Sequence, residues 1–289
     1  MNGILVLDKP AGMSSAYAVD AVKKRLGAAR AGHGGTLDPI ATGVLPICLD
    51  EATKLAQYLL ADDKAYEAEL LLGVETDSLD RTGTVTATRE VTATREAFEA
   101  ALRARTGEQD QVPPMFSAIK QGGRRLYHMA RAGEEIEREP RRIRIDQLEL
   151  LAWDPPRAKI AIACSKGTYV RSLIADLGTD VGCGAHMTEL RRTRSGAFTL
   201  AQAHDLDRLD NVRLVPMKEA TKLPKAVAPA ELIQRVRDGL QLPPEAFSVP
   251  SEIYERFLLV DAVGELVSIC HVDRGKVIYD RVFKPSPGP

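Results

Sequence analysis

Residues 30–46 contain the two side chains best suited to chemistry, His33 and Asp38, which lie five positions apart. Glycines at positions 32, 34, 35 and 43 let a bulky substrate approach the backbone closely. A phosphate-binding loop of the Walker type needs a lysine after its last glycine, and this segment has none. A metal site needs more ligands than one histidine and one aspartate. Asp38 is therefore the candidate reacting group.

An aspartate carboxylate has an ordinary pKa of about 3.9, so this residue type is ionised at neutral pH and can act as a nucleophile or a base. A hydrolytic glycosidase would usually need a second carboxylate to protonate its leaving group. In this segment Asp38 is the only carboxylate, and Asp50 and Glu51 follow beyond a strand-like run. The alternative interpretation is structural, because an Asp before a Pro in a glycine-rich loop is a common turn residue.

Regular elements on both sides can hold this segment in place. The apolar run at residues 3–7 predicts a short buried strand. Ser14 or Ser15 can cap a helix over residues 16–26, and residues 43–49 return to strand character. The connection between them is longer than an ordinary loop, and such loops often carry function.

Alternation and helical periodicity predict further elements along the chain. They are strands at residues 64–72, 84–88, 142–151 and 159–164, and helices at residues 52–60, 95–105 and 168–177. Gly178 would end the last of these helices. Because helices and strands are interspersed without a βαβ rhythm, we expect an α+β fold with a mixed, largely antiparallel central sheet flanked by helices.

The apolar density falls between residues 205 and 225, which predicts a domain boundary there. We expect a catalytic domain over residues 1–222 and a small β-rich domain over residues 223–289. The second contains short strand-like runs separated by Asp and Gly turns.

The composition is that of a soluble protein, with 44% hydrophobic and 27% charged residues and a net charge of −1. There is no run of 18 apolar residues and no basic leader, so neither a transmembrane helix nor a signal peptide is expected. The four cysteines are widely spaced, which argues against a zinc cluster or a disulfide scaffold and fits a reducing cytoplasm.

Positive charge is concentrated locally. Residues 120–144 hold eight basic and four acidic side chains, and Arg191, Arg192 and Arg194 form a second cluster. Each cluster could be a solvated face or a phosphate-binding surface, because RNA affinity depends on local rather than net charge.

The runs GHGGTLDP at residues 32–39 and ATGVL at residues 41–45 resemble the catalytic motif of the TruB family of tRNA pseudouridine synthases. Further runs resemble other family motifs in the same order along the chain. They are GILVLDKPAGMSS at 3–15, KAY at 64–66, VPPMFSAIK at 112–120, CSKGTYVRS at 164–172, GCGAH at 182–186 and LRR at 190–192. The resemblance covers roughly residues 3–210, and beyond them the chain only faintly resembles a PUA domain.

The resemblance implies three catalytic residues. Asp38 matches the catalytic aspartate, and Arg171 matches the arginine that pairs with it and would hold it ionised. Tyr66 matches the tyrosine that packs against the target base, where its hydroxyl could relay the C5 proton. Without the resemblance, Arg171 would be interpreted as a solvated helix residue and Tyr66 as a half-buried strand aromatic.

Five further residues match positions that bind substrate. His33 matches a residue linked with extruding the target nucleotide, and Leu190 matches a residue that forms an apolar wall of the base pocket. Lys9 matches the family's N-terminal lysine, for which a structural role or a backbone contact is expected. Arg141 and Arg142 lie in the segment that resembles an RNA-clamping insertion, and we expect them to contact phosphates.

The resemblance implies an enzyme that isomerises uridine 55 in the T-loop of tRNA to pseudouridine on a flipped-out uridine. It also implies a cytoplasmic monomer that needs no cofactor, no metal and no obligate protein partner. Whether the aspartate attacks C1′ or removes a ribose 2′ proton stays open. Three alternatives remain: an RNA glycosylase, an RNA-binding module without enzymatic activity, and a guide-dependent enzyme within a ribonucleoprotein.

Overall fold

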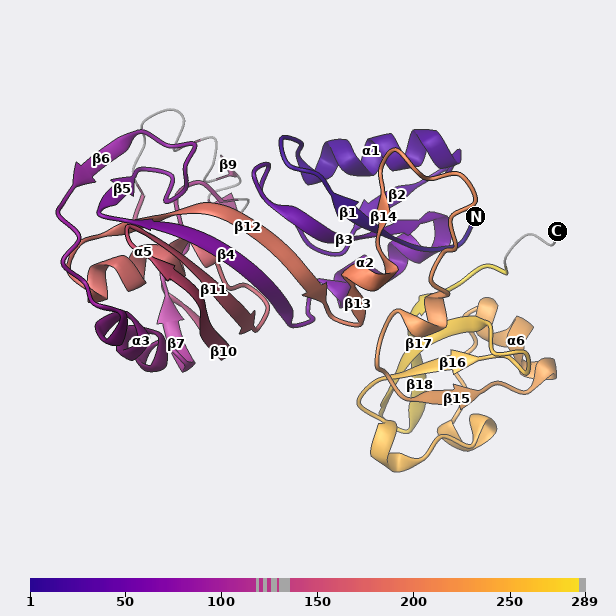
Figure 1. Ribbon diagram of the computed structural model, residues 1–289. Coiled ribbons are helices and arrows are strands. Elements are labelled where there is room, and N and C mark those ends of the chain that lie inside the picture. Colours follow the sequence, from indigo (N-terminus) through magenta and orange to yellow (C-terminus); the bar gives the residue numbers. More distant parts are fainter. Residues whose placement is uncertain (118–119, 122–123, 126–128, 130–135, 286–289) are drawn as a thin grey trace. The chain divides into compact units, whose positions relative to one another are not determined.

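The computed structural model describes residues 1–117, 120–121, 124–125, 129 and 136–285 (Figure 1). The chain forms two compact units. The first unit comprises Met1–Pro39, Val44–Ala61 and Gly196–Pro289, and the second comprises Ile40–Gly43 and Asp62–Ser195. The chain therefore passes from one unit to the other directly after Asp38 and Pro39. No helix within the described residues is long and apolar enough to cross a membrane.

The N-terminal part of the first unit forms the predicted strand, helix and strand. Strand β1 (Gly3–Lys9) is paired in parallel with β14 (His204–Asp205), and β3 (Thr42–Leu49) is antiparallel to β2 (Ala31–His33). β2 lies inside the stretch expected to be loop. Helix α1 (Ser15–Leu26) is capped by Ser14, and it ends where Gly27 adopts a left-handed conformation.

The helix predicted over residues 52–60 is only partly correct. The chain first forms a 3₁₀ turn, η1 (Asp50–Leu55), and only then the single α-helical turn α2 (Ala56–Leu59). The Thr53 hydroxyl donates to the carbonyl of Asp50 at 2.6 Å, three residues earlier. This contact favours the tighter 3₁₀ spacing over an α-helical start.

The second unit is built on the predicted antiparallel sheet. Its strands follow the order β12 (Ala185–Ser195), β4 (Lys64–Leu72), β11 (Arg157–Cys164), β10 (Arg141–Asp154) and β7 (Gly107–Gln111). The outer edge of β12 is paired in parallel with Thr42 and Gly43, the first residues of β3. Helices α3 (Arg95–Ala104) and α5 (Val170–Asp180) pack on this sheet. Two small hairpins are formed by β5 (Val74–Thr76) with β6 (Val85–Thr88), and by β8 (Lys120–Gln121) with β9 (Arg124–Arg125).

Gly178 does not end α5 as predicted, because the helix continues to Asp180. A Cβ atom on Gly178 would lie 2.2 Å from the backbone nitrogen of Ala185 in β12. This glycine therefore allows the helix to approach the sheet closely instead of terminating it.

The last part of the first unit is a four-stranded sheet. Its order is β15 (Lys225–Val227), β16 (Phe257–Val260), β17 (Leu266–Asp273) and β18 (Lys276–Val282), with α6 (Ala230–Arg237) packed against it. The remaining short elements are β13 (Phe198–Thr199), η2 (Leu200–Gln202), η3 (Met217–Glu219), η4 (Pro244–Phe247) and η5 (Ser251–Ile253).

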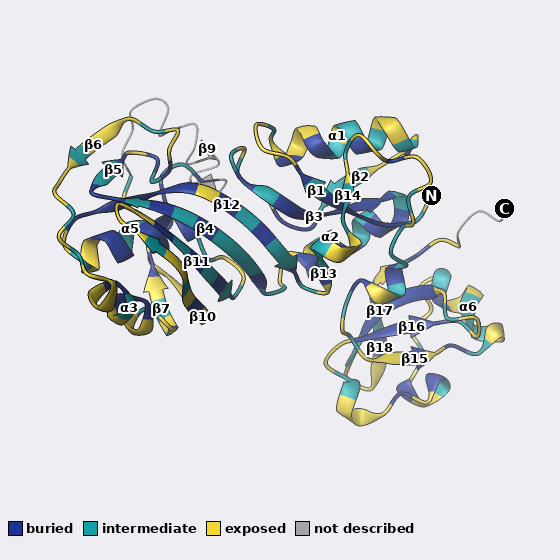
Figure 2. Ribbon diagram, viewed as in Figure 1, coloured by how far each residue is buried: buried dark blue, intermediate teal, exposed yellow. Residues whose placement is uncertain are grey.

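Strand β16 is buried on both of its faces (Figure 2). Phe257 and Leu259 belong to a core within the C-terminal part of the chain. Leu258 and Val260 belong to a second core, which also contains Ile4 and other residues of β1 and β3. We call this second cluster the shared core. It comprises Ile4, Val6, Val44, Cys48, Ala52, Leu55, Leu59, Phe198, Met217, Ala220, Leu258, Val260, Leu266, Ile269 and Phe283.

The predicted fold class is confirmed: a mixed sheet is flanked by few helices and followed by a small β-rich part. The domain boundary at residue 222 stays a prediction. The C-terminal sheet has a core of its own, yet it also contributes to the shared core.

Candidate active site

Asp38 is half-buried and lies between two residues whose backbone is anchored. The Ser15 hydroxyl donates to the carbonyl of Leu37 at 2.9 Å and accepts from its N–H at 2.8 Å. On the other side, the carbonyl of Pro39 accepts from the backbone N–H of Gly12 at 2.8 Å. These contacts hold the backbone immediately before and after Asp38.

Lys9 ties the same loop to the end of β1. Its side chain is completely buried, and its ammonium group donates to the carbonyls of Pro10 at 2.8 Å, Met13 at 2.9 Å and Pro39 at 3.4 Å. A buried ammonium group requires such acceptors, because desolvation without them is costly. The contact to Pro39 brings Lys9 together with the backbone of the loop that carries Asp38.

His33 is the last residue of β2 and is half-buried. Its Nδ1 accepts a hydrogen bond from the backbone N–H of Gly35 at 3.3 Å. In the neutral ring the proton then lies on Nε2, so that this atom is the donor. The N–H of Gly35 thereby favours one orientation and one tautomer of the His33 ring.

Gly43 allows the segment after Asp38 to pair with β12. Its φ is +101°, and a Cβ atom on it would lie 2.2 Å from the carbonyl oxygen of Arg192. Any other residue would push the two strands apart at this point. Thr42 and Gly43 lie opposite Arg191 and Arg192, and Arg191 Nη1 also donates to Thr42 Oγ1 at 3.4 Å.

Tyr66 and Leu190 lie on one face of the sheet in the second unit. On β4, Tyr66 and Ala68 point to the same face, and their partners on β12 are Arg192 and Leu190. Leu190 is buried and Tyr66 is half-buried. Two predicted site residues from different parts of the sequence are therefore brought together.

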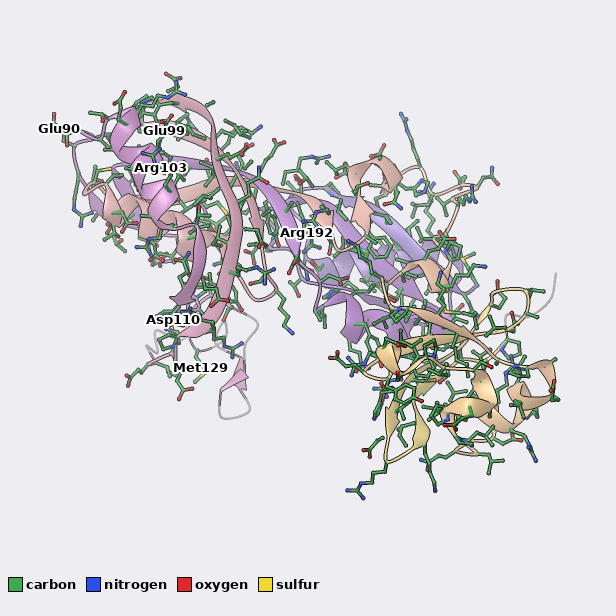
Figure 3. All side chains as sticks on the ribbon, turned by 90° about the horizontal axis from the view of Figure 1, so that it is seen from below. Glu90, Glu99, Arg103, Asp110, Met129 and Arg192 are labelled. Atoms are coloured by element: carbon green, nitrogen blue, oxygen red, sulfur yellow. The ribbon has the colours of Figure 1, made fainter. Side chains whose placement is uncertain are left out.

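Two buried cationic side chains share this face with Tyr66. Lys64 lies two residues before Tyr66, and Arg192, which is labelled in Figure 3, is the partner of Tyr66 on β12. Burial, and then the positive charge of Arg192, lower the pKa of Lys64 to about 8. Lys64 therefore adds positive charge to this face as the pH falls through about 8.

Arg171 is buried in the first turn of α5 and is held by backbone carbonyls. Its guanidinium donates to the carbonyl of Ser78 at 3.0 Å and to that of Phe116 at 2.8 Å. Its Nε lies 3.8 Å from Oδ2 of the buried Asp80. These contacts fix the plane of the guanidinium. The predicted pairing with Asp38 stays a prediction.

Asp80 is a functional candidate that the sequence did not single out. Its Oδ1 accepts from the Ser78 hydroxyl at 2.8 Å, and from the backbone N–H and hydroxyl of Thr82 at 2.9 and 2.6 Å. A carboxylate held in this way orients the guanidinium of Arg171. Residues 77–83 are mostly polar, but nothing local in the sequence indicates that they face a residue 91 positions later, at 171.

Arg141 and Arg142 are exposed at the start of β10. Arg142 is 3.0 Å from Glu108 and 3.8 Å from Asp110 on the neighbouring strand β7 (Asp110 is labelled in Figure 3). In the basic segment of residues 120–144, residues 122–123, 126–128 and 130–135, which include Arg131, lie outside the described residues.

The model of the N-terminal domain of TruB family pseudouridylate synthases matches residues 23–170. The model of the C-terminal domain of tRNA pseudouridylate synthase B matches residues 171–233. The tRNA pseudouridine synthase B of Pseudomonas paraeruginosa is 54% identical over 212 residues, which are 73% of this chain and 70% of that protein. The tRNA pseudouridine synthase B of Thiobacillus denitrificans is 45% identical over 287 residues, which are 98% of this chain and 96% of that protein.

Solved structures show the same fold. One chain of a Cbf5–Nop10–Gar1 complex is 28% identical with a TM-score of 0.76, and the match covers 98% of this chain and 85% of that chain. One chain of an H/ACA RNP bound to a substrate RNA containing 2′-deoxyuridine is 26% identical with a TM-score of 0.75, at the same coverage of 98% and 85%. The chain belongs to the TruB family of pseudouridylate synthases.

Proposed function

We propose that this protein isomerises uridine 55 in the T-loop of tRNA to pseudouridine, with Asp38 as the catalytic carboxylate. The observation that carries the proposal is the anchored loop: the backbone on both sides of Asp38 is held by buried or backbone groups, in a chain of a pseudouridylate synthase family. Catalysis requires that the reacting group be held in place before the substrate arrives.

The reaction is an isomerisation. The N1–C1′ bond of the uridine breaks, the uracil turns, and a C5–C1′ bond forms, while C5 loses a proton and N1 gains one. A single carboxylate suits this chemistry, because the base leaves and returns instead of being released. Asp38 would either attack C1′ or remove the 2′ proton.

The other site residues have separate tasks in this proposal. The ring of Tyr66 stacks on the target uracil, and its hydroxyl relays the C5 proton. Arg171, oriented by Asp80, keeps the catalytic carboxylate ionised, and Leu190 forms an apolar wall beside Tyr66. Lys64 and Arg192 add positive charge on the same face, which favours an anionic RNA.

The target uridine must leave its stack before C1′ and C5 can be reached, and this is easiest in a loop. We propose that the imidazole of His33 stacks on the displaced neighbour and offsets part of that cost. The protein would act in the cytoplasm, as a single chain without a guide RNA or protein partner. The relatives named tRNA pseudouridine synthase B support tRNA as the substrate.

The test is to incubate the protein alone with a tRNA T-stem-loop and to analyse the RNA by mass and by chemical mapping of pseudouridine. We expect one pseudouridine at position 55 and an unchanged RNA mass. Release of free uracil would identify a glycosylase, and binding without any product would identify a non-enzymatic module. Activity that appears only after a guide RNA is added would identify a ribonucleoprotein enzyme.

Arg141→Ala with Arg142→Ala is expected to weaken RNA binding and to flatten its dependence on salt. Each lost phosphate contact lowers the slope of log affinity against log salt by about one. Titrations of labelled T-stem-loop RNA at several salt concentrations measure this slope. Glu139→Ala, which removes an exposed acidic side chain just before β10, serves as the comparison. Unchanged affinity and slope in the double variant would place the phosphate contacts elsewhere.

A further inference from the structure

The hydroxyl of Ser15 makes an unusual pair of contacts. It donates to the carbonyl and accepts from the N–H of the same residue, Leu37, at 2.9 and 2.8 Å. Ser15 is 2% exposed and Leu37 is 3% exposed, so both contacts are shielded from solvent. A hydroxyl has one donor hydrogen, and the Ser15 hydroxyl donates it to the carbonyl of Leu37, the residue before Asp38.

Capping of the helix does not account for this serine. The N-cap of α1 is Ser14, whose side chain accepts from the backbone N–H of Tyr17 at 3.1 Å. Ser15 is the first residue within the helix, and its side chain is directed to a loop 22 positions later in the sequence. Two adjacent serines thus have different tasks: one completes the helix, and the other holds the loop.

The contact fixes the residue that precedes the proposed catalytic carboxylate. Pro39, on the other side, is held by Gly12 and Lys9. Pro39 also limits the φ freedom of its own backbone. Because the backbone of Leu37 and of Pro39 is held, the direction of the Cα–Cβ bond of Asp38 is fixed. The contacts of Ser15 with Leu37 are part of what fixes it.

We infer that Ser15 is a positioning residue for Asp38, acting through Leu37 and without touching the substrate. This inference rests on the proposed catalytic role of Asp38. Without the Ser15 hydroxyl, the buried N–H and C=O of Leu37 lose their hydrogen-bond partner. Because leaving buried polar groups unpaired is costly, the loop shifts to pair them elsewhere. A displacement of about 1 Å at a reacting group can lower the rate by about 10²-fold.

The test compares single-turnover rates, RNA affinities and melting temperatures of full-length variants with a T-stem-loop RNA. Ser15→Ala is expected to lower the rate constant by about 10- to 100-fold and to change the affinity by less than about twofold. Ser15→Thr, which keeps the hydroxyl, should recover most of the rate. If Ser15→Ala does not fold, Ser15→Cys replaces it, and its weakly donating thiol should give an intermediate rate.

Ser14→Ala is the matched control, because it removes the neighbouring hydroxyl and only the helix cap. It should lower the melting temperature and leave the rate constant intact. A wild-type rate in Ser15→Ala, or a rate loss that Ser14→Ala reproduces at the same melting temperature, would overturn the inference. Asp38→Asn is measured in parallel. If it keeps full activity, the proposed role of Asp38 fails. If it is inactive while Ser15→Ala is fully active, only the inference about Ser15 fails.

Discussion

Asp38→Asn is expected to lower the rate of pseudouridine formation by at least about 10²–10⁴-fold while RNA binding persists. An amide of the same shape carries no negative charge, so it can neither attack C1′ nor accept a proton. The loop should keep its position, because its contacts run through Ser15, Lys9 and the backbone of Gly12. Chemical mapping of pseudouridine gives the rate, and filter binding gives the affinity.

Asp20→Asn provides the control for this experiment. Asp20 lies on the exposed side of α1 in an ion pair with Lys24 at 2.8 Å, and such surface pairs contribute little. We expect its rate to equal that of the unchanged protein. A wild-type rate in Asp38→Asn would show that another group performs the reaction.

A chain that ends at residue 222 is expected to lose the folded state of the first unit. Deletion removes Leu258, Val260, Leu266, Ile269 and Phe283 from the shared core, where each is at most 5% exposed. Burial of each such side chain stabilises the fold by about 1.5–3 kcal/mol. Their combined contribution, about 10 kcal/mol, is as large as the free energy of unfolding of a typical domain.

Phe283→Ala tests the same point within the full chain. Truncating this completely buried ring should lower the free energy of unfolding by about 3–5 kcal/mol. Val263→Ala is the control, because that side chain is 78% exposed, and it should change the free energy of unfolding by less than about 0.5 kcal/mol. Urea denaturation followed by circular dichroism measures both. A shortened chain with an unchanged midpoint would mean that the catalytic part folds without the C-terminal sheet.

Elements with one buried face were predictable from the sequence. Residues 64–72 alternate, and they form β4 (Lys64–Leu72) with Ala68, Leu70 and Leu72 buried. Strand β12 was missed although it pairs with β4 along its length and with the start of β3. Its sequence contains three arginines, and Arg192 is only 1% exposed. Nothing local distinguishes a buried arginine from a solvated one, because burial is decided by how distant parts of the chain pack around the side chain.

The candidate site was predictable in its residue types but not in its supporting contacts. The glycine-rich segment and the family motifs indicated Asp38, Tyr66 and Arg171. The contacts of Ser15 with Leu37 and of Asp80 with Arg171 join residues 22 and 91 positions apart. Such pairs follow from the path of the chain in three dimensions, which periodicity and propensity do not contain.

Strand β16, covered on both sides, has a consequence for how the C-terminal sheet finds its register. All four residues of Phe257–Val260 are apolar and buried, and a slip by one position would exchange the two faces and draw the flanking Arg256 or Asp261 into a buried position. The charged flanks therefore limit the slip, but hydrophobicity within the strand does not distinguish its two faces. Side-chain volume has to do so, because the phenyl ring of Phe257 and the small Val260 face different cores and do not fit each other's positions.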